Sequence, residues 1–379
     1  MLQVLDALDQ LMERPVVDAL ADVLHAARSV MDALRPFLVA AAAAPAPALS
    51  GPPPPLAGAM PRWQWPSDGA TPLGQAAFQL RTGARMPAVG FGTWRLWAKE
   101  AYQPVRWALE LGYRHIDTAE GYANEEHIGR ALRDSGVPRE EVFLATKLSS
   151  VPKGLAEPQY TEDIFSMQLS QLGTSYVDLY MLHTPPQDLV ELRALWARME
   201  ALHDQGRARA LGISNVDARE LRELLSFARI PPAYVQNMFK VYKPGEQMLS
   251  DDDVIGLAHA NQIAVMGYSV QTDWPHIMPP LEDPHVLQVA AEVGRSPSQV
   301  LHRWALQRGV GVIPKSAQRA RIEENARLLD FSLGEAHMRA LDGLATLSES
   351  GARPPGRPAW QPDAFGLFGG GGPSGGAGA

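Results

Sequence analysis

The chain of 379 residues contains no cysteine. This absence excludes disulfide bonds, thiolate metal sites and a cysteine nucleophile, and it leaves the redox compartment open. The chain also lacks any run of about eighteen uninterrupted apolar residues, so it predicts no membrane-spanning helix. Its formal net charge is -8, and we therefore expect no nucleic-acid partner, since such partners bind basic surfaces.

Positive charge is scarce at the N-terminus. The first 44 residues hold six acidic side chains against three basic ones. Organelle transit peptides are rich in arginine and poor in acids, and secretory signals begin with a basic segment. We therefore expect a cytoplasmic protein.

The ends of the chain differ from its middle in composition. Residues 45–75 are rich in proline, alanine and glycine, which predicts an extended linker. Residues 351–379 are rich in glycine and proline, and we expect disorder at their end. A helical extension over 1–44, this linker, a main domain over 76–350 and the tail make up the predicted organisation, and the 46% apolar content is enough for a large core.

The main domain alternates short apolar runs with amphipathic stretches. A hairpin is predicted over 78–89, with Thr82-Gly83 as its turn. Eight strands are predicted over 89–91, 113–117, 142–147, 177–182, 210–214, 233–237, 264–269 and 310–314. Helices are predicted over 101–110, 124–133, 161–172, 189–203, 218–227, 251–261, 297–307 and 322–328.

This alternation of eight strands with eight helices is typical of a parallel (β/α)8 TIM barrel. Several strands are apolar on both faces, as in Val142-Phe143-Leu144, which suits strands covered on both sides. A doubly wound open sheet is the alternative. Its fingerprint Gly-x-Gly-x-x-Gly is missing after the first strand, where Gly90-Phe91-Gly92 continues into Thr93-Trp94-Arg95.

Four polar residues stand at or just after the ends of three predicted strands: Asp117, Tyr122, Lys147 and His183. The carboxyl ends of parallel barrel strands converge on one mouth, so these side chains should meet. Tyrosine and lysine titrate near pH 10 when unperturbed, and a phenol beside an ammonium held by a carboxylate exchanges its proton more easily. The set indicates proton chemistry at a carbonyl or alcohol oxygen.

Several motifs in order along the chain resemble the aldo-keto reductases. They are Gly90-Phe91-Gly92-Thr93-Trp94, Asp117 to Tyr122 with Asn124-Glu125, Thr146-Lys147, Gly212-Ile213-Ser214-Asn215, Gln236, Gly267-Tyr268-Ser269 and Ile313-Pro314-Lys315-Ser316. The resemblance runs over roughly 270 of the 379 residues, from Phe78 to Ala345. It implies a (β/α)8 barrel that uses NADPH, without metal or flavin, to reduce an aldehyde or ketone to an alcohol.

The resemblance also implies roles for the four polar residues. Tyr122 would be the general acid that protonates the carbonyl oxygen, and Lys147, paired with Asp117, would lower the phenol pKa. His183 would donate to the substrate oxygen and orient the carbonyl. A positioned proton donor contributes about 10²–10⁴ in rate.

Cofactor residues are implied in the same way. Ser214, Asn215 and Gln236 would bind the nicotinamide carboxamide, and Tyr268 would stack on its ring. The adenosine end would be held at a 2′-phosphate by Lys315, Ser316 and Arg321, and at the adenine by Glu324 and Asn325. The predicted cofactor set also includes Gly92, Thr93 and Ser269.

The chain departs from the family pattern at four places. Ala123 stands where glycine is usual, and Thr184-Pro185-Pro186 replaces an aromatic residue after His183. Asn237 follows Gln236 in place of glutamate, and Val270-Gln271-Thr272 replaces Pro-Leu-Gly. Two other functions stay open: an NADPH-binding regulatory subunit with slow or no turnover, and a barrel of different function such as a phosphate-binding lyase.

The N-terminal extension carries an apolar stripe at helical spacing: Val17, Leu20, Leu24, Ala27, Met31 and Leu34. Pro15 and Pro36 should divide the segment into three helices, because proline lacks the amide needed in a helix interior. A helix packed on its own barrel, an extension without a role, and an element for self-association or for a protein partner are all compatible with this stripe.

Overall fold

The computed structural model describes residues 65–149, 158–186, 188–242, 254–272 and 279–344. The chain divides into two units, residues 1–57 and 58–379, and all described residues belong to the second. The predicted helical extension, the first part of the linker and the tail lie outside the described residues.

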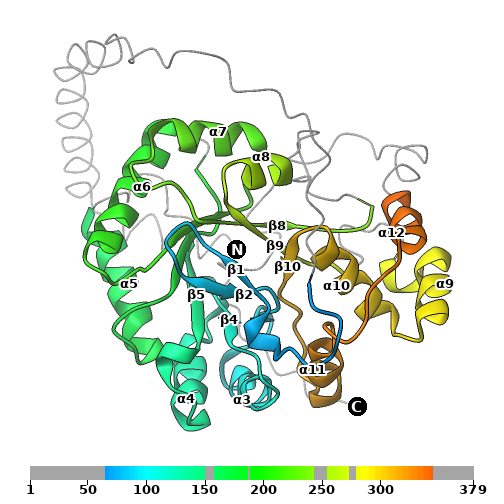
Figure 1. Ribbon diagram of the computed structural model, residues 1–379. Coiled ribbons are helices and arrows are strands. Elements are labelled where there is room, and N and C mark those ends of the chain that lie inside the picture. The colour runs from blue at the N-terminus through cyan, green and yellow to red at the C-terminus, as the bar shows by residue number, and fades with distance from the viewer. Residues whose placement is uncertain (1–64, 150–157, 187, 243–253, 273–278, 345–379) are drawn as a thin grey trace, which may run out of the picture. The chain divides into compact units, whose positions relative to one another are not determined.

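Eight parallel strands form one sheet in the order β10-β9-β8-β7-β6-β5-β4-β3. They are β3 (Phe91–Gly92), β4 (His115–Asp117), β5 (Phe143–Leu148), β6 (Leu179–Leu182), β7 (Leu211–Ser214), β8 (Tyr234–Met238), β9 (Ala264–Tyr268) and β10 (Val310–Val312). The first and last strands meet where Val89 pairs with Val312 in parallel. There the Gly90 amide donates to the Val312 carbonyl at 2.8 Å. The ring of strands is therefore closed, and the predicted (β/α)8 barrel is confirmed (Figure 1).

The strands are buried on both faces. All six residues of β5 and all four of β6 are buried, as expected for a parallel barrel with a packed interior and an outer ring of helices. The closing seam needs glycine, because a Cβ on Gly92 would lie 2.7 Å from the Ile313 carbonyl oxygen. The Gly-x-Gly of the first strand therefore serves barrel closure.

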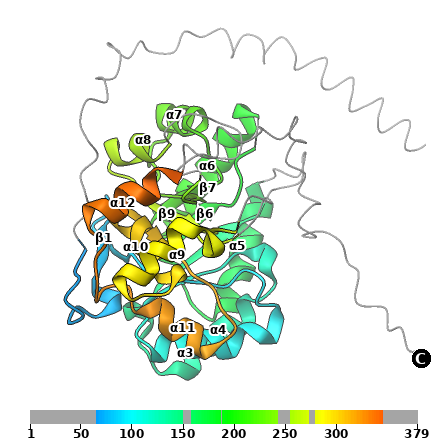
Figure 2. The same cartoon turned by 90° about the vertical axis from the view of Figure 1, so that its right-hand side faces the viewer.

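Helices surround the strands (Figures 1 and 2). They are α3 (Tyr102–Glu110), α4 (Glu125–Ser135), α5 (Pro158–Leu172), α6 (Leu189–Asp204), α7 (Ala218–Phe227), α8 (Val254–Ala260), α9 (Pro284–Val293), α10 (Pro297–Gln307), α11 (Arg319–Ala326) and α12 (Glu335–Asp342). Capping boxes begin two of them, with Asp217 and Glu220 on α7 and with Ser296 and Gln299 on α10. Helices α9 and α12 were not predicted from the sequence.

The hairpin β1 (Ala77–Gln79) and β2 (Arg85–Pro87) is antiparallel. Its position directly before β3 puts it at the amino ends of the barrel strands, and it lies across that end of the barrel (Figure 1). The turn is the predicted one, with Gly83 at φ 85°. Only glycine adopts such a φ readily.

The end of the predicted linker packs on the barrel. The Trp65 indole donates to the Leu306 carbonyl at 2.7 Å, and the buried Arg303 donates to the Pro66 carbonyl at 3.0 Å. Residues 65–66 are therefore held against α10, and this end of the predicted linker is not a free spacer.

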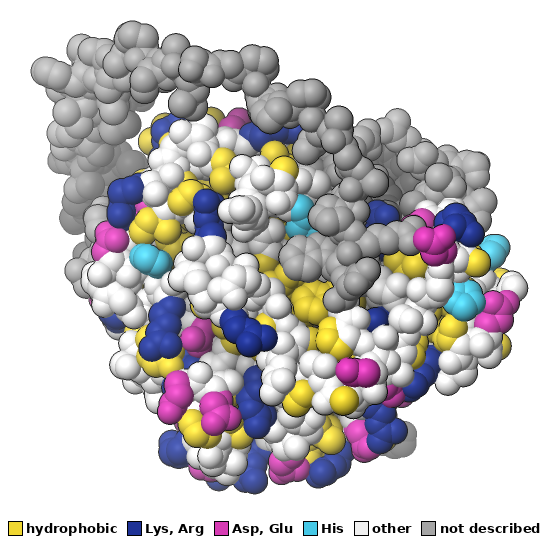
Figure 3. Space-filling view, viewed as in Figure 1, with side chains coloured by type: hydrophobic (Ala, Val, Ile, Leu, Met, Phe, Trp, Pro, Cys, Tyr) yellow, Lys and Arg dark blue, Asp and Glu magenta, His cyan; other side chains and the backbone are white. Residues whose placement is uncertain are grey.

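Basic and acidic side chains are interspersed on the face shown in Figure 3. Ion pairs join some of them, such as Arg319 Nη1 to Glu110 Oε2 at 3.1 Å, and exposed pairs of this kind stabilise little. Within the described ranges, no helix is both long enough and apolar enough to pass through a membrane.

Candidate active site

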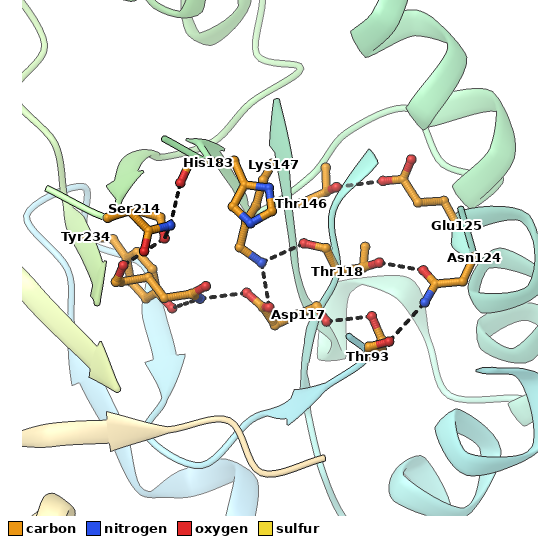
Figure 4. A network of polar contacts seen from close by, with 12 residues as sticks. Thr93, Asp117, Thr118, Asn124, Glu125, Thr146, Lys147, His183, Ser214 and Tyr234 are labelled. Atoms are coloured by element: carbon orange, nitrogen blue, oxygen red, sulfur yellow. Dashed lines mark hydrogen bonds and ion pairs between the residues drawn. The ribbon is translucent and has the colours of Figure 1, made fainter. Parts of the chain in front are cut away.

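Three of the four residues predicted to meet, Asp117, Lys147 and His183, come from neighbouring strand ends (Figure 4). Asp117 ends β4, Lys147 is the next-to-last residue of β5, and His183 directly follows β6. Tyr122 ends a short 3-10 helix, Glu120–Tyr122, that begins three residues after β4. Parallel strands in register deliver these side chains to the same mouth of the barrel.

Lys147 and Asp117 form a buried ion pair. The Lys147 ammonium lies 2.6 Å from Asp117 Oδ1 and donates to the Thr118 carbonyl at 2.8 Å. The Lys147 side chain is 0% exposed and that of Asp117 3%. A third residue joins them, since Gln236 Nε2 donates to Asp117 Oδ2 at 2.8 Å. The carboxylate is thus held on both oxygens.

The Tyr122 ring lies near both the Lys147 ammonium and the His183 imidazole. Its ring centroid is 5.2 Å from Lys147 Nζ and 5.7 Å from the His183 ring, which it meets edge to face at 76°. The Tyr122 ring thus contacts both a buried cation and an imidazole at the mouth of the barrel.

Burial controls the titration of this site. The pKa of Tyr122 is raised well above its ordinary value, first by burial and second by the Asp117 charge. The expected lowering by Lys147 is therefore not seen, since burial and the Asp117 charge both act in the opposite direction. Burial, and then Lys147, lower the pKa of His183 to about 3. At neutral pH the phenol is therefore protonated and the imidazole is neutral.

The backbone around Tyr122 is held by its neighbours. Ala123 has φ 51°, in the left-handed region, which explains why glycine is usual at this place. Asn124 accepts from Thr118 Oγ1 at 2.8 Å and donates to the carbonyls of Thr93 and Leu96 at 3.0 and 2.9 Å. One buried amide thus ties the loops after β3 and β4 together.

The residues expected at the nicotinamide cluster after β7 and β9. Asn215 Nδ2 donates to the His183 carbonyl at 2.8 Å, and Tyr268 OH donates to Asn215 Oδ1 at 2.5 Å. Ser214 Oγ donates to the Gln236 carbonyl at 2.7 Å. Asn215 and Ser269 have φ 58° and 57°, a strained backbone of the kind found at ligand sites.

Two residues assigned to the cofactor contact Asp117 instead. Gln236 donates to its carboxylate and to Tyr234 OH, and Thr93 Oγ1 donates to its carbonyl oxygen at 2.9 Å. Gly92 pairs with Asp117 in the barrel sheet. Gln236 therefore holds the Asp117 carboxylate, whereas Thr93 and Gly92 hold its backbone.

The residues expected at the phosphate follow β10. Lys315 and Arg321 are exposed and form no ion pair with any described residue. Partial loss of solvation, and then the charge of Arg95, lower the pKa of the Lys315 ammonium even though the residue is exposed. Ser316 Oγ accepts from the Gln318 amide at 3.0 Å, just before α11. Unpaired cations beside a helix N-terminus make a suitable phosphate site.

The residues expected at the adenine are bound to α10. Ser296 Oγ donates to Glu324 Oε1, and Ser298 Oγ donates to Asn325 Oδ1 at 3.0 Å. Arg321 and Glu324 therefore do not form the helix pair that their spacing allows. The glutamate instead fixes α11 on the start of α10.

Sequence reasoning missed three residues of the site. Arg95 directly follows the motif that ends at Trp94, but nothing along the chain shows that its charge lies near Lys315. Asn124 and Glu125 belong to a family motif, but the sequence assigns them no role in the site. Their polar character between two buried stretches was the available signal, because a buried amide or carboxylate needs partners.

A model of the aldo/keto reductase family matches residues 88–272 and 281–346. Rat aldo-keto reductase family 1 member A1 is 35% identical over 294 residues, which cover 70% of this chain and 88% of the rat protein. The 9,11-endoperoxide prostaglandin H2 reductase of Trypanosoma cruzi is 35% identical over 267 residues, covering 70% and 90%.

Solved structures are similar over the same part of the chain. An aldo/keto reductase from Brucella melitensis superposes with a TM-score of 0.64 at 32% identity, covering 71% of this chain and 98% of that one. MGS-M4, an aldo-keto reductase enzyme from a deep-sea metagenome library, gives 0.65 at 33% identity, covering 71% and 95%.

Proposed function

The chain belongs to the aldo/keto reductase family of oxidoreductases, and on that premise we propose that it reduces an aldehyde or ketone to an alcohol with NADPH. The observation that supports this most is the position of the Tyr122 ring beside the buried Lys147–Asp117 pair. The proposal includes a cytoplasmic location, which microscopy of the tagged full-length chain tests.

Tyr122 supplies the proton in this proposal. Its raised pKa keeps the phenol protonated at neutral pH, which is the form that a general acid needs. As the carbonyl oxygen gains negative charge, the phenol proton moves to it and the phenolate is left behind. In the reverse direction the phenolate accepts the alcohol proton.

Lys147 stabilises the charge that develops on Tyr122. Its ammonium is preorganised by Asp117 and Thr118, so it need not reorient during the reaction. Preorganised charges in a dry site stabilise developing charge far better than water does. Gln236 and Thr93 keep Asp117 in place for this purpose.

His183 orients the substrate. A neutral imidazole can donate one hydrogen bond without adding a second positive charge beside Lys147. Its backbone amide donates to the Leu148 carbonyl at 2.9 Å, and its carbonyl accepts from Asn215. The ring is thus carried by a backbone fixed on both sides, which favours one carbonyl orientation.

The residues present fit a dinucleotide phosphate. Arg95, Lys315 and Arg321 are cations without an ion-pair partner among the described residues, and a 2′-phosphate or diphosphate would neutralise them. Ser214, Asn215 and Tyr268 would hold the nicotinamide end. When bound, NADPH supplies the hydride for the carbonyl carbon.

NADPH oxidation with a panel of aldehydes and ketones tests the proposal. We expect steady turnover by the wild type. Tyr122→Phe should bind NADPH normally but lose most of the turnover. Tight NADPH binding with no turnover on any carbonyl would contradict the reductase and favour the regulatory-subunit alternative.

A further inference from the structure

A second polar cluster, which includes Thr146 and Glu125, lies beside Lys147 (Figure 4). Thr146 precedes Lys147 on β5, and successive strand side chains point to opposite faces. Thr146 Oγ1 donates to Glu125 Oε1 of α4 at 2.6 Å. Gln168 of α5 donates to the same Glu125 oxygen at 3.0 Å and to the Lys147 carbonyl at 3.2 Å. Glu125 is thus connected to Lys147 through its strand.

The carboxylate of Glu125 is unusual in its surroundings. The residue is 2% exposed, and its Oε2 has no hydrogen-bond partner among the described residues. The charged and titratable groups around it are Lys147 of β5, Glu120 of the 3-10 helix before α4, and Tyr180 of β6. No cation of the described residues forms an ion pair with it, so ionisation of this buried carboxylate carries a solvation cost that protonation removes.

We propose that Glu125 is a positioning residue that acts through Thr146 and Lys147 and makes carbonyl reduction faster as the pH falls through neutrality. The inference rests on the proposed reductase function. In this inference the buried cluster does more than pack: the charge of Glu125 sets the electrostatic potential that the Lys147 ammonium produces at the Tyr122 phenol.

The sign follows from electrostatics. Burial raises the pKa of Glu125 to about 7, against the Thr146 and Gln168 hydrogen bonds. When ionised, Glu125 raises the pKa of Lys147, which means that its charge offsets part of the ammonium field. Protonation of Glu125 removes that offset, so the proton leaves Tyr122 more easily. Reduction should therefore slow as the pH rises through about 7.

Glu125→Gln tests the inference, because glutamine keeps an oxygen for Thr146 and Gln168 but cannot ionise. Single-turnover reduction of an aldehyde by the NADPH-loaded enzyme should slow about three- to tenfold between about pH 6 and about pH 8 in the wild type. In Glu125→Gln the rate should stay near the wild-type acid value. The matched control is Glu126→Gln, the exposed next residue on α4, which should follow the wild type.

A second measurement keeps the test independent of turnover. In the wild type, the stability gained from the raised pKa of Glu125 is fully present below pH 4.5 and lost as pH rises through about 7. Relative to Glu125→Gln, the unfolding equilibrium constant should thus change on the order of a hundredfold across that window.

The two failures are distinguishable. Parallel rate profiles in wild type and Glu125→Gln would overturn the inference and leave the reductase standing. A wild type without turnover would overturn the reductase, and with it the role of Glu125 in rate. Stability differences that do not vary with pH would show that Glu125 does not titrate near neutrality, and would overturn the inference directly.

Discussion

Replacing Lys147 by methionine should destabilise the barrel by about 3 kcal/mol. The two side chains of the Lys147–Asp117 pair are 0% and 3% exposed, so removal of the ammonium leaves a carboxylate buried without its cation. Loss of one partner of such a pair costs about 3–5 kcal/mol, far more than the 0–1 kcal/mol of a surface pair. Gln236 still donates to Asp117 at 2.8 Å, which favours the lower end of this range.

Urea unfolding at neutral pH measures this change, with Lys147→Met/Asp117→Asn as the matched control. The double variant buries no unpaired charge and should regain most of the lost stability. For the single variant the deficit should shrink in acid, where a proton removes the stranded charge. A loss under about 1 kcal/mol, or a double variant no more stable than Lys147→Met, would refute the reasoning.

Three further changes have defined outcomes. Arg321→Ala should weaken the binding of NADPH about ten- to a hundredfold and leave the binding of NADH nearly unchanged, because a charge-assisted hydrogen bond to phosphate is worth roughly 1.5–3 kcal/mol. Equal losses of affinity for both cofactors in fluorescence titrations would show that Arg321 has a structural role. Ala123→Gly should stabilise the fold by about 0.5–1 kcal/mol, because glycine relieves the φ of 51° at an exposed position; a lower melting temperature would speak against strain there. Deletion of residues 1–64 should leave kcat/KM within about threefold, and we propose that the deletion removes self-association or a partner site. Lost activity would contradict a tethered extension. Identical monomer masses of the full-length and truncated proteins in light scattering would exclude self-association.

The barrel could be predicted because its strands carry a strong local signal. Runs such as Val142-Phe143-Leu144 are apolar on both faces, and β5 and β6 are indeed wholly buried. The catalytic set followed from the same pattern, since polar residues at the ends of parallel strands must converge. Helix α9 was missed because Pro279, Pro280 and Pro284 suggest a loop. Yet Asp283 caps that helix and Pro284 is its first residue, a combination that typically begins helices.

Other parts of the site depend on contacts that the sequence does not display. Gln236 reaches Asp117 across 119 positions of sequence, and no local pattern distinguishes that partner from a cofactor amide. The pKa of Tyr122 is raised by burial and by the Asp117 charge, and the burial of a side chain cannot be read from the spacing of motif residues. Glu324 has a cofactor role by resemblance, and one of its two carboxylate oxygens accepts from Ser296. Spacing locates such residues at the mouth, and only packing decides what they touch.

The central claim is that Tyr122 delivers the proton while the hydride comes from NADPH. Single-turnover reduction with NADPH deuterated at the transferable position tests both halves at once, in wild type and Tyr122→Phe. We expect deuterium on the alcohol carbon in the wild type. In the variant we expect a rate at least about 10²-fold lower with unchanged NADPH binding. A wild-type rate in Tyr122→Phe, or an alcohol without the label, would contradict the account.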